Sequence, residues 1–93
     1  MEVSIKERET EGYAIARENE KRAGAMTYSI AGEKLIIIDH TEVEPEYKGK
    51  SVGKEMLYKI VDMARGKNIK IIPLCPFAAA MFKREDDIKD VLK

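Results

Sequence analysis

In the first half of the chain, apolar residues alternate with small or polar residues, as they do in strands that are buried on one face. The charged segment 1–10 carries two aliphatic residues at this spacing and predicts a weak edge strand. Residues 13–17 and 23–30 predict two further strands, and a polar turn at 18–21 separates them.

After a turn at 31–33, the segment 34–43 begins with an apolar run from Leu35 to Ile38. A continuous run of this kind predicts a central strand that is covered on both faces. Because all connections up to this point are short turns, the strands are expected to form an antiparallel meander.

From residue 52 the apolar period becomes that of a helix, which Gly66 is expected to end. Residues 69–73 then predict a short strand. A strand, a helix and a strand in succession make a crossover, so 34–43 and 69–73 are expected to run parallel. The apolar stripe of the helix consists of Val52, Met56, Leu57, Ile60, Val61 and Ala64.

The C-terminal part predicts two more helices. The first begins at Cys75-Pro76-Phe77 and runs to about Arg84, because proline is tolerated in a first turn. The second begins at the acidic run 85–87. Its expected inward-facing residues are Ile88, Val91 and Leu92.

These elements predict an α/β fold with a mixed sheet (α+β), in which an antiparallel meander precedes a parallel β-α-β crossover and C-terminal helices. The length fits a single domain over 1–93. Apolar residues at 44% and charged residues at 37% are typical of a soluble globular protein. The 17 basic and 17 acidic side chains cancel, which leaves no overall field to hold nucleic acid or an anionic membrane.

No apolar stretch approaches the roughly 20 residues of a membrane span. The N-terminus carries no apolar signal region. One cysteine and one histidine exclude an internal disulfide and a structural zinc site. We therefore expect a cytoplasmic protein without a metal, a membrane or a nucleic-acid partner.

The segment 47–54, Tyr-Lys-Gly-Lys-Ser-Val-Gly-Lys, joins the predicted strand to the predicted helix. A helix N-terminus carries unpaired backbone N–H groups and the positive end of the helix dipole, and both favour phosphate. Three lysines add charge, and Gly49 and Gly53 would let the backbone approach a ligand. A phosphate-bearing cofactor is therefore one interpretation of this segment, and an ordinary solvated loop before an amphipathic helix is the other.

The only histidine, His40, lies toward the carboxyl end of the first parallel strand, beside the loop that follows it. On an unbroken strand it would share a face with Ile36 and Ile38, and a bulge would change this. Histidine titrates near neutrality and can act as a general base, although it can equally be a hydrogen-bonded residue that closes a strand. Glu42 is a second candidate base and Asp39 a third, on the opposite face.

The only cysteine, Cys75, lies just past the carboxyl end of the second parallel strand, so it is expected at the same edge of the sheet as His40. It directly precedes Pro76 and is therefore expected at a helix N-terminus, which favours the thiolate. Such a thiol would serve as a nucleophile or a general acid. The alternative is a small buried residue without chemistry.

The loop 47–54 resembles the acetyl-CoA diphosphate loop of the GNAT superfamily of N-acetyltransferases, whose pattern is Arg/Gln-x-x-Gly-x-Gly/Ala. His40-Thr-Glu-Val43 precedes this loop, and Pro73-Leu-Cys-Pro-Phe77 follows it. With both flanking motifs, the chain from about Gly12 to its end resembles a small GNAT-like branch of that superfamily.

The resemblance implies acetyl-CoA as the cofactor, CoA as its product, and an unidentified amine of a small molecule or a protein as the acceptor. His40 would be the base. Cys75 would take the acetyl group or protonate the leaving CoA thiolate. The residues expected to contact the cofactor are Glu42, Val43, Lys48, Gly49, Lys50, Ser51, Val52, Gly53, Lys54, Pro76 and Phe77.

Two positions depart from the family pattern. Lys48 replaces the usual arginine and cannot form a bidentate fork, and Ser51 replaces the middle glycine and is expected to act as an N-cap. The first strands are joined by turns too short for helices, so the acceptor half of a full-size enzyme is largely missing. A non-catalytic CoA-binding or regulatory module is therefore the alternative function, and a homodimer would be one way to complete the acceptor half.

Overall fold

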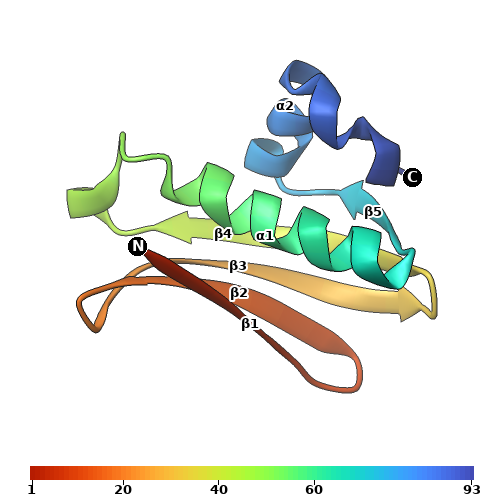
Figure 1. Ribbon diagram of the computed structural model, residues 1–93, viewed down its shortest axis with the longest axis horizontal. Coiled ribbons are helices and arrows are strands. Elements are labelled where there is room, and N and C mark those ends of the chain that lie inside the picture. Colours follow the sequence, from red (N-terminus) through yellow and green to blue (C-terminus); the bar gives the residue numbers. More distant parts are fainter.

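The computed structural model describes all residues 1–93 and contains one five-stranded sheet in the order β1-β2-β3-β4-β5. The first four strands are antiparallel neighbours, and β5 pairs with β4 in parallel (Figure 1). The predicted α/β fold with a mixed sheet is confirmed. The strands are β1 (Glu2–Glu7), β2 (Glu11–Glu18), β3 (Lys21–Gly32), β4 (Leu35–Val43) and β5 (Lys70–Pro73).

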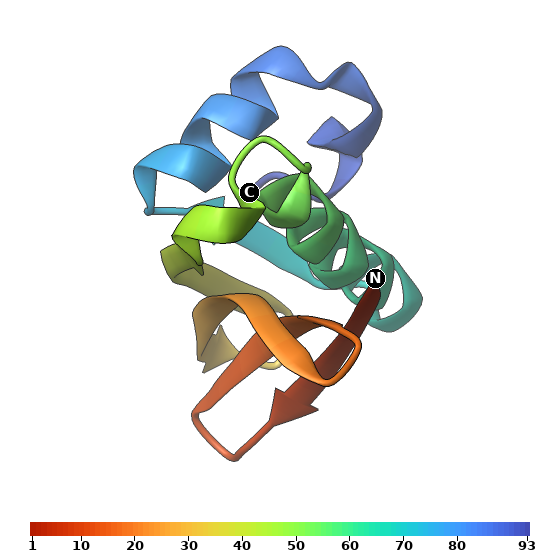
Figure 2. The same ribbon diagram turned by 90° about the vertical axis from the view of Figure 1, so that its left-hand side faces the viewer.

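The helix α1 (Val52–Lys67) makes the crossover from β4 to β5 and lies along one face of the sheet (Figures 1 and 2). A short 3-10 turn, η1 (Pro45–Tyr47), precedes it. The helix α2 (Pro76–Arg84) and the 3-10 turn η2 (Asp86–Val91) follow β5 and lie beyond that strand. No helix combines the length and the apolar character that a membrane span requires.

The hydrophobic core lies between α1 and one face of the sheet. Ile36 and Ile38 of β4 are fully buried in it, whereas Leu35 and Ile37 are only partly buried. The expectation that β4 is covered on both faces is therefore wrong. Only one face of the sheet carries the crossover helix, so alternate residues of the apolar run in β4 enter the core and the others stay partly exposed.

A β-bulge interrupts β4 at Asp39. Thr27 pairs with His40 while Tyr28 pairs with Ile38, so Asp39 has no partner on β3. Residues that pair directly across two strands share a face. His40 therefore shares the outer face with the exposed Thr27, and Thr41, which pairs with the buried Met26, takes the inner face. The bulge reverses the alternation that an unbroken strand would have given.

Some details of these elements differ from those expected. α1 continues through Gly66 and ends at Lys67, and the C-cap Asn68 has a left-handed backbone whose N–H donates to the carbonyls of Ala64 and Arg65. The turn after β3 lies at 33–34 instead of 31–33. Ile88 and Val91 of η2 are buried as expected, but Leu92, which follows η2 and was expected to face inward, is 38% exposed.

Polar contacts fix the C-terminal segment to α1. Arg65 donates two hydrogen bonds to the carboxylate of Asp90, with N–O distances of 2.9 and 2.8 Å. The Tyr58 hydroxyl donates to Asp87 at 2.8 Å. Desolvation, followed by this hydrogen bond, raises the pKa of Tyr58 to about 12. The contacts hold α2 and η2 at a set position beside α1.

The conformation of Ser51 determines how α1 begins. Ser51 has φ 62° and ψ 27°, in the left-handed region, and its side chain makes no capping hydrogen bond. Ser51 therefore occupies the expected N-cap position, but its hydroxyl does not cap the helix. It also carries the steric cost of a Cβ in a conformation that favours glycine.

The absence of a Cβ at Gly12 makes room for the Tyr28 ring. A Cβ on Gly12 would overlap that ring, which is fully buried and held by a hydrogen bond of 2.7 Å to Glu7. Gly12→Ala should lower the free energy of unfolding by about 1–3 kcal/mol. Gly32→Ala is the matched control, because no atom lies within 4 Å of that site. Denaturant titrations compare them, and equal midpoints would contradict the packing described.

Substitutions at Ser51 separate backbone strain from capping. Ser51→Gly should raise the free energy of unfolding by about 0.5–1 kcal/mol, because glycine adopts positive φ without a Cβ clash. Ser51→Ala should leave it within about 0.5 kcal/mol, since no cap is lost. Urea titrations measure both. A loss of about 1 kcal/mol in Ser51→Ala would show that the hydroxyl caps the helix after all.

Candidate cofactor site

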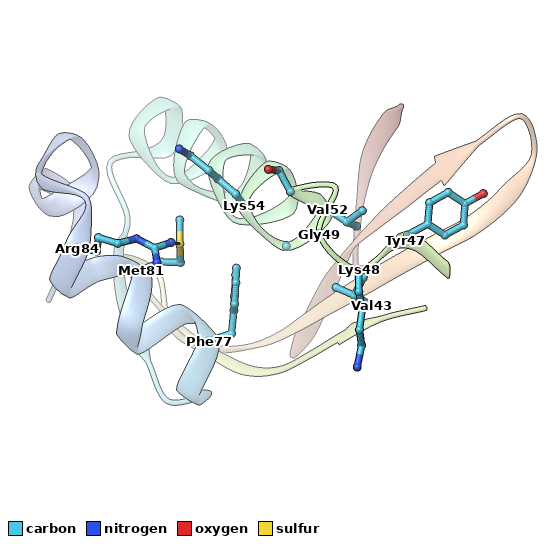
Figure 3. A pocket seen from close by; sticks show the side chains of 11 residues that line it. Val43, Tyr47, Lys48, Gly49, Val52, Lys54, Phe77, Met81 and Arg84 are labelled. Carbon is cyan, nitrogen blue, oxygen red and sulfur yellow. Dashed lines mark hydrogen bonds between the residues drawn. The ribbon is translucent and has the colours of Figure 1, made fainter. Parts of the chain in front are cut away.

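A cavity of about 350 Å³ opens between the loop before α1, the first turn of α1 and one face of α2 (Figure 3). The loop forms one side and α2 the other, and the start of α1 lies between them. The residues that line it are Val43, Tyr47, Lys48, Gly49, Ser51, Val52, Gly53, Lys54, Phe77, Met81 and Arg84.

Backbone N–H groups with no partner in the protein gather at this cavity. The first helical hydrogen bond of α1 runs from the Glu55 N–H to the Ser51 carbonyl, so the amides of 51–54 have no backbone acceptor. The Gly49 amide has none either, and no side chain accepts from any of the five. Gly49 has φ 84° and leaves open space where a Cβ would be. The arrangement is a concave set of donors of the kind that binds anions.

The charge around the cavity is positive. Lys48, Lys54 and Arg84 line it, and no carboxylate does. Glu85 lies outside the lining and contacts Lys54 at 3.8 Å and Arg84 at 3.2 Å. One carboxylate shared by two cations leaves an excess of positive charge, although the whole chain has formal net charge +0.

The sequence suggested that Gly53 keeps a space open for a ligand, but the structure shows that it does not. A Cβ at Gly53 would lie 2.6 Å from Cζ of Phe77, so the aromatic ring already fills that space. Gly53 is buried beneath this ring, which itself remains 37% exposed at the cavity. The glycine thus allows α1 and α2 to approach closely, and its contribution toward a ligand is its free amide.

The strands β4 and β5 part beside the cavity. Their pairing ends at Ile38 and Pro73, and the N–H groups of Leu74 and Cys75 then donate to the Ile38 carbonyl. The rest of β4, residues 39–43, has β3 on one side and no strand on the other. This open edge leads from Cys75 to Val43 at the cavity.

Cys75 is the N-cap residue of α2, as predicted, and is only 4% exposed. Its Sγ accepts a hydrogen bond from the Ala78 N–H at 3.4 Å, and it lies 3.1 Å from the Thr41 hydroxyl. Thr41 reaches the thiol because the bulge turned it to the inner face. The structure therefore pairs the cysteine with a threonine that the sequence did not single out.

His40 lies on the outer face, with 67% of its side chain exposed. Its Nε2 is 3.6 Å from the carboxylate of Glu42, which also accepts from Arg22 at 3.0 Å. Asp39 accepts from the Ser29 hydroxyl at 2.6 Å. The topology brings His40 and Cys75 to the same end of the sheet, but the hydrogen bonds of Cys75 do not include His40.

Most of the residues predicted to contact a cofactor line the cavity, and three do not. Glu42 is on the outer face, Pro76 lies outside the lining, and Lys50 extends over the Tyr47 ring at 5.7 Å. Three further lining residues, Tyr47, Met81 and Arg84, were not among the residues predicted to contact a cofactor. Spacing was the available signal, because Phe77, Met81 and Arg84 recur at one face of a helix. The lining residues that were predicted are Val43, Lys48, Gly49, Ser51, Val52, Gly53, Lys54 and Phe77.

Known structures share this fold. The solution structure of a "GCN5-like putative N-acetyltransferase" from Staphylococcus aureus is 38% identical, covering 97% of this chain and 87% of that one, with a TM-score of 0.72. The ribosomal-protein-S18-alanine N-acetyltransferase of Escherichia coli is 14% identical, covering 84% and 53%, with a TM-score of 0.71. A "putative streptothricin acetyltransferase" from Bacillus anthracis, solved with acetyl coenzyme A, is 18% identical, covering 83% and 46%, with a TM-score of 0.64.

The last two similarities show the fold alone, and this chain spans about half the length of those proteins. No curated protein matches the sequence. A family model described as GCN5-related N-acetyl-transferase matches residues 12–91, nearly the whole chain. The chain therefore belongs to the GCN5-related N-acetyl-transferases, a family of acyltransferases that use acetyl-CoA, and the resemblance found in its sequence is confirmed.

Proposed function

We propose that this protein transfers the acetyl group of acetyl-CoA to a primary amine, and that Cys75 carries the acetyl group between them. One observation supports the proposal above all others. Five free amides and a cavity without carboxylates lie at one end of an open strand edge, and a buried thiol at a helix N-terminus lies at the other.

The cavity fits the anionic part of the cofactor. The free amides of Gly49 and 51–54 would donate to the diphosphate, and Lys48 and Lys54 would supply charge. Lys48 offers a point charge in place of an arginine fork. The amides carry the greater share of the recognition, since their positions are set by the backbone.

The open edge of β4 fits the amide-containing pantetheine arm. Backbone groups of 39–43 that face away from β3 lack a strand partner, and an arm with amides can hydrogen-bond to them as an added strand would. Val43 and Phe77 supply apolar surface at the cavity end of this edge. The edge would direct the acyl end toward Cys75.

Two hydrogen-bond donors lie beside the Cys75 sulfur. The Ala78 N–H donates to Sγ at 3.4 Å and the Thr41 hydroxyl lies 3.1 Å from it, so both would stabilise the negative charge that the sulfur carries during the transfer. The thiolate would attack the acetyl carbonyl, forming a new S–C bond as the CoA thiolate leaves and takes up a proton. An amine would then attack the acetyl group, releasing the Cys75 thiolate and giving its proton to a base.

His40, Glu42 and Asp39 are the candidate bases for that last proton. All three lie on the outer face, which is where an acceptor can approach, because the other face is filled by the core. Of the three, His40 is best suited, since Glu42 is engaged by Arg22 and Asp39 by Ser29. In a variant of the mechanism, Cys75 would instead protonate the leaving CoA thiolate.

The second candidate function is a CoA-binding module without turnover. The absence of an acceptor pocket favours it, because neither the cofactor cavity nor four other surface cavities are lined by His40, Thr41 or Cys75. A homodimer would supply the missing walls if turnover occurs. Cofactor binding without acetyl transfer would identify the module.

Incubation with labelled acetyl-CoA tests the role of the thiol. The protein should gain one acetyl group that hydroxylamine removes, and Cys75→Ala should gain none, because this is the only cysteine. His40→Gln should still be acetylated but should transfer to amines at least about tenfold more slowly. Intact-protein mass spectra and CoA release measure these steps. Full amine acetylation by Cys75→Ala would refute the cysteine intermediate.

Binding of CoA tests the loop. Gly49→Val should weaken CoA binding about tenfold or more, because a β-branched residue resists the positive φ that aims these amides. Gly66→Ala is the matched control, since that glycine lies within α1 and has open space around it. Calorimetry measures both affinities. Unchanged affinity in Gly49→Val would place the diphosphate elsewhere.

A further inference from the structure

Arg84 occupies the end of the cavity that the proposed acetyl transfer does not use. In Figure 3, Arg84 and Met81 lie at one end, and Val43 and Lys48 lie at the other. Cys75 precedes the first turn of α2, whereas Arg84 is its last residue. Phe77 and Arg84 are seven residues apart, which is about 10 Å along a helix. The cavity therefore has a second end, directed away from the thiol.

The guanidinium of Arg84 makes two contacts at this end, and 67% of its side chain remains exposed to a ligand. Its Nη2 lies 2.8 Å from Sδ of Met81, and its Nε donates to Glu85 at 3.2 Å. Lys54 contacts the other oxygen of Glu85 at 3.8 Å. The two cations share one carboxylate, so together they keep a net positive charge. The fork of arginine matches a phosphate group, and neither cation has a role in the acyl end of the site.

The covalent order of CoA determines what reaches this position. The diphosphate joins the pantetheine arm on one side to a ribose with a 3′-phosphate on the other. If the amides at the start of α1 hold the diphosphate and the arm runs toward Cys75, the ribose leaves the diphosphate on the opposite side. That side of the cavity carries Arg84 and Lys54.

We infer that Arg84, with Lys54, binds the 3′-phosphate of CoA and makes this protein select CoA over 3′-dephospho-CoA. The inference rests on the proposed function, since it needs the diphosphate in the loop. The 3′-phosphate adds roughly two negative charges that dephospho-CoA lacks. It would replace Glu85 as the partner of the two cations, at the rim of the cavity.

Calorimetric titration of the whole chain with CoA and with 3′-dephospho-CoA tests this directly. The unmodified protein should bind CoA about tenfold more tightly than dephospho-CoA. Arg84→Gln should reduce that ratio to about twofold by weakening CoA binding alone, and Arg84→Lys should give an intermediate ratio. Lys83→Gln is the matched control, because Lys83 is the adjacent residue on α2 and lines a different cavity.

Each outcome decides one of the two proposals. Unchanged dephospho-CoA binding by Arg84→Gln, together with a lost preference for CoA, supports the 3′-phosphate contact and shows that the variant is folded. Equal binding of both nucleotides by the unmodified protein overturns the contact while the proposed function stands. If Lys83→Gln lowers the preference for CoA as much as Arg84→Gln does, the contact is also overturned, because the overall positive charge of α2 would then explain the preference. If neither nucleotide binds, the proposed function itself fails.

Discussion

The end of the parallel pairing between β4 and β5 is the constraint on which the rest of the site depends. Pairing stops at Ile38 and Pro73, which leaves residues 39–43 of β4 with an open edge in the interior of the strand order. Unpaired backbone groups need partners, and a ligand with amides can supply them. Cys75 lies where the strands part, because its own N–H still donates to the Ile38 carbonyl. The parting of the strands therefore creates the edge and places the thiol at its inner end.

The bulge at Asp39 distributes the candidate chemistry over two faces. By leaving one residue unpaired, it turns Thr41 toward Cys75 and His40 toward solvent. A thiol on the inner side and an imidazole on the outer side suit a reaction with two partners that arrive from different directions. The same bulge keeps His40 out of the hydrogen bonds of Cys75, so their cooperation would have to pass through an acceptor bound between them.

Recognition of an anion in this protein is local and relies mainly on the backbone. The chain has no net charge, yet the cavity has three cations and no carboxylate in its lining. Its amides stay free because Ser51 begins α1 in a left-handed conformation without capping it. A capping side chain would satisfy part of this helix end and occupy donors that an anion needs. The start of α1 is therefore less stable than a capped helix would be, and its amides stay available to an anion.

The sequence by itself determined the order of the elements, the mixed sheet and the loop that lines the cavity. Apolar periodicity and the Lys/Gly pattern are local properties, and neighbouring residues are enough to produce them. Only the tertiary structure decided the face of His40, the pairing of Thr41 with Cys75 and the place of Arg84 in the cavity. A bulge depends on the partner strand, and the lining of a cavity depends on how α2 packs against α1. Contacts between segments distant in sequence set these features; the helical spacing of Phe77, Met81 and Arg84 shows that they share a face but not what that face meets.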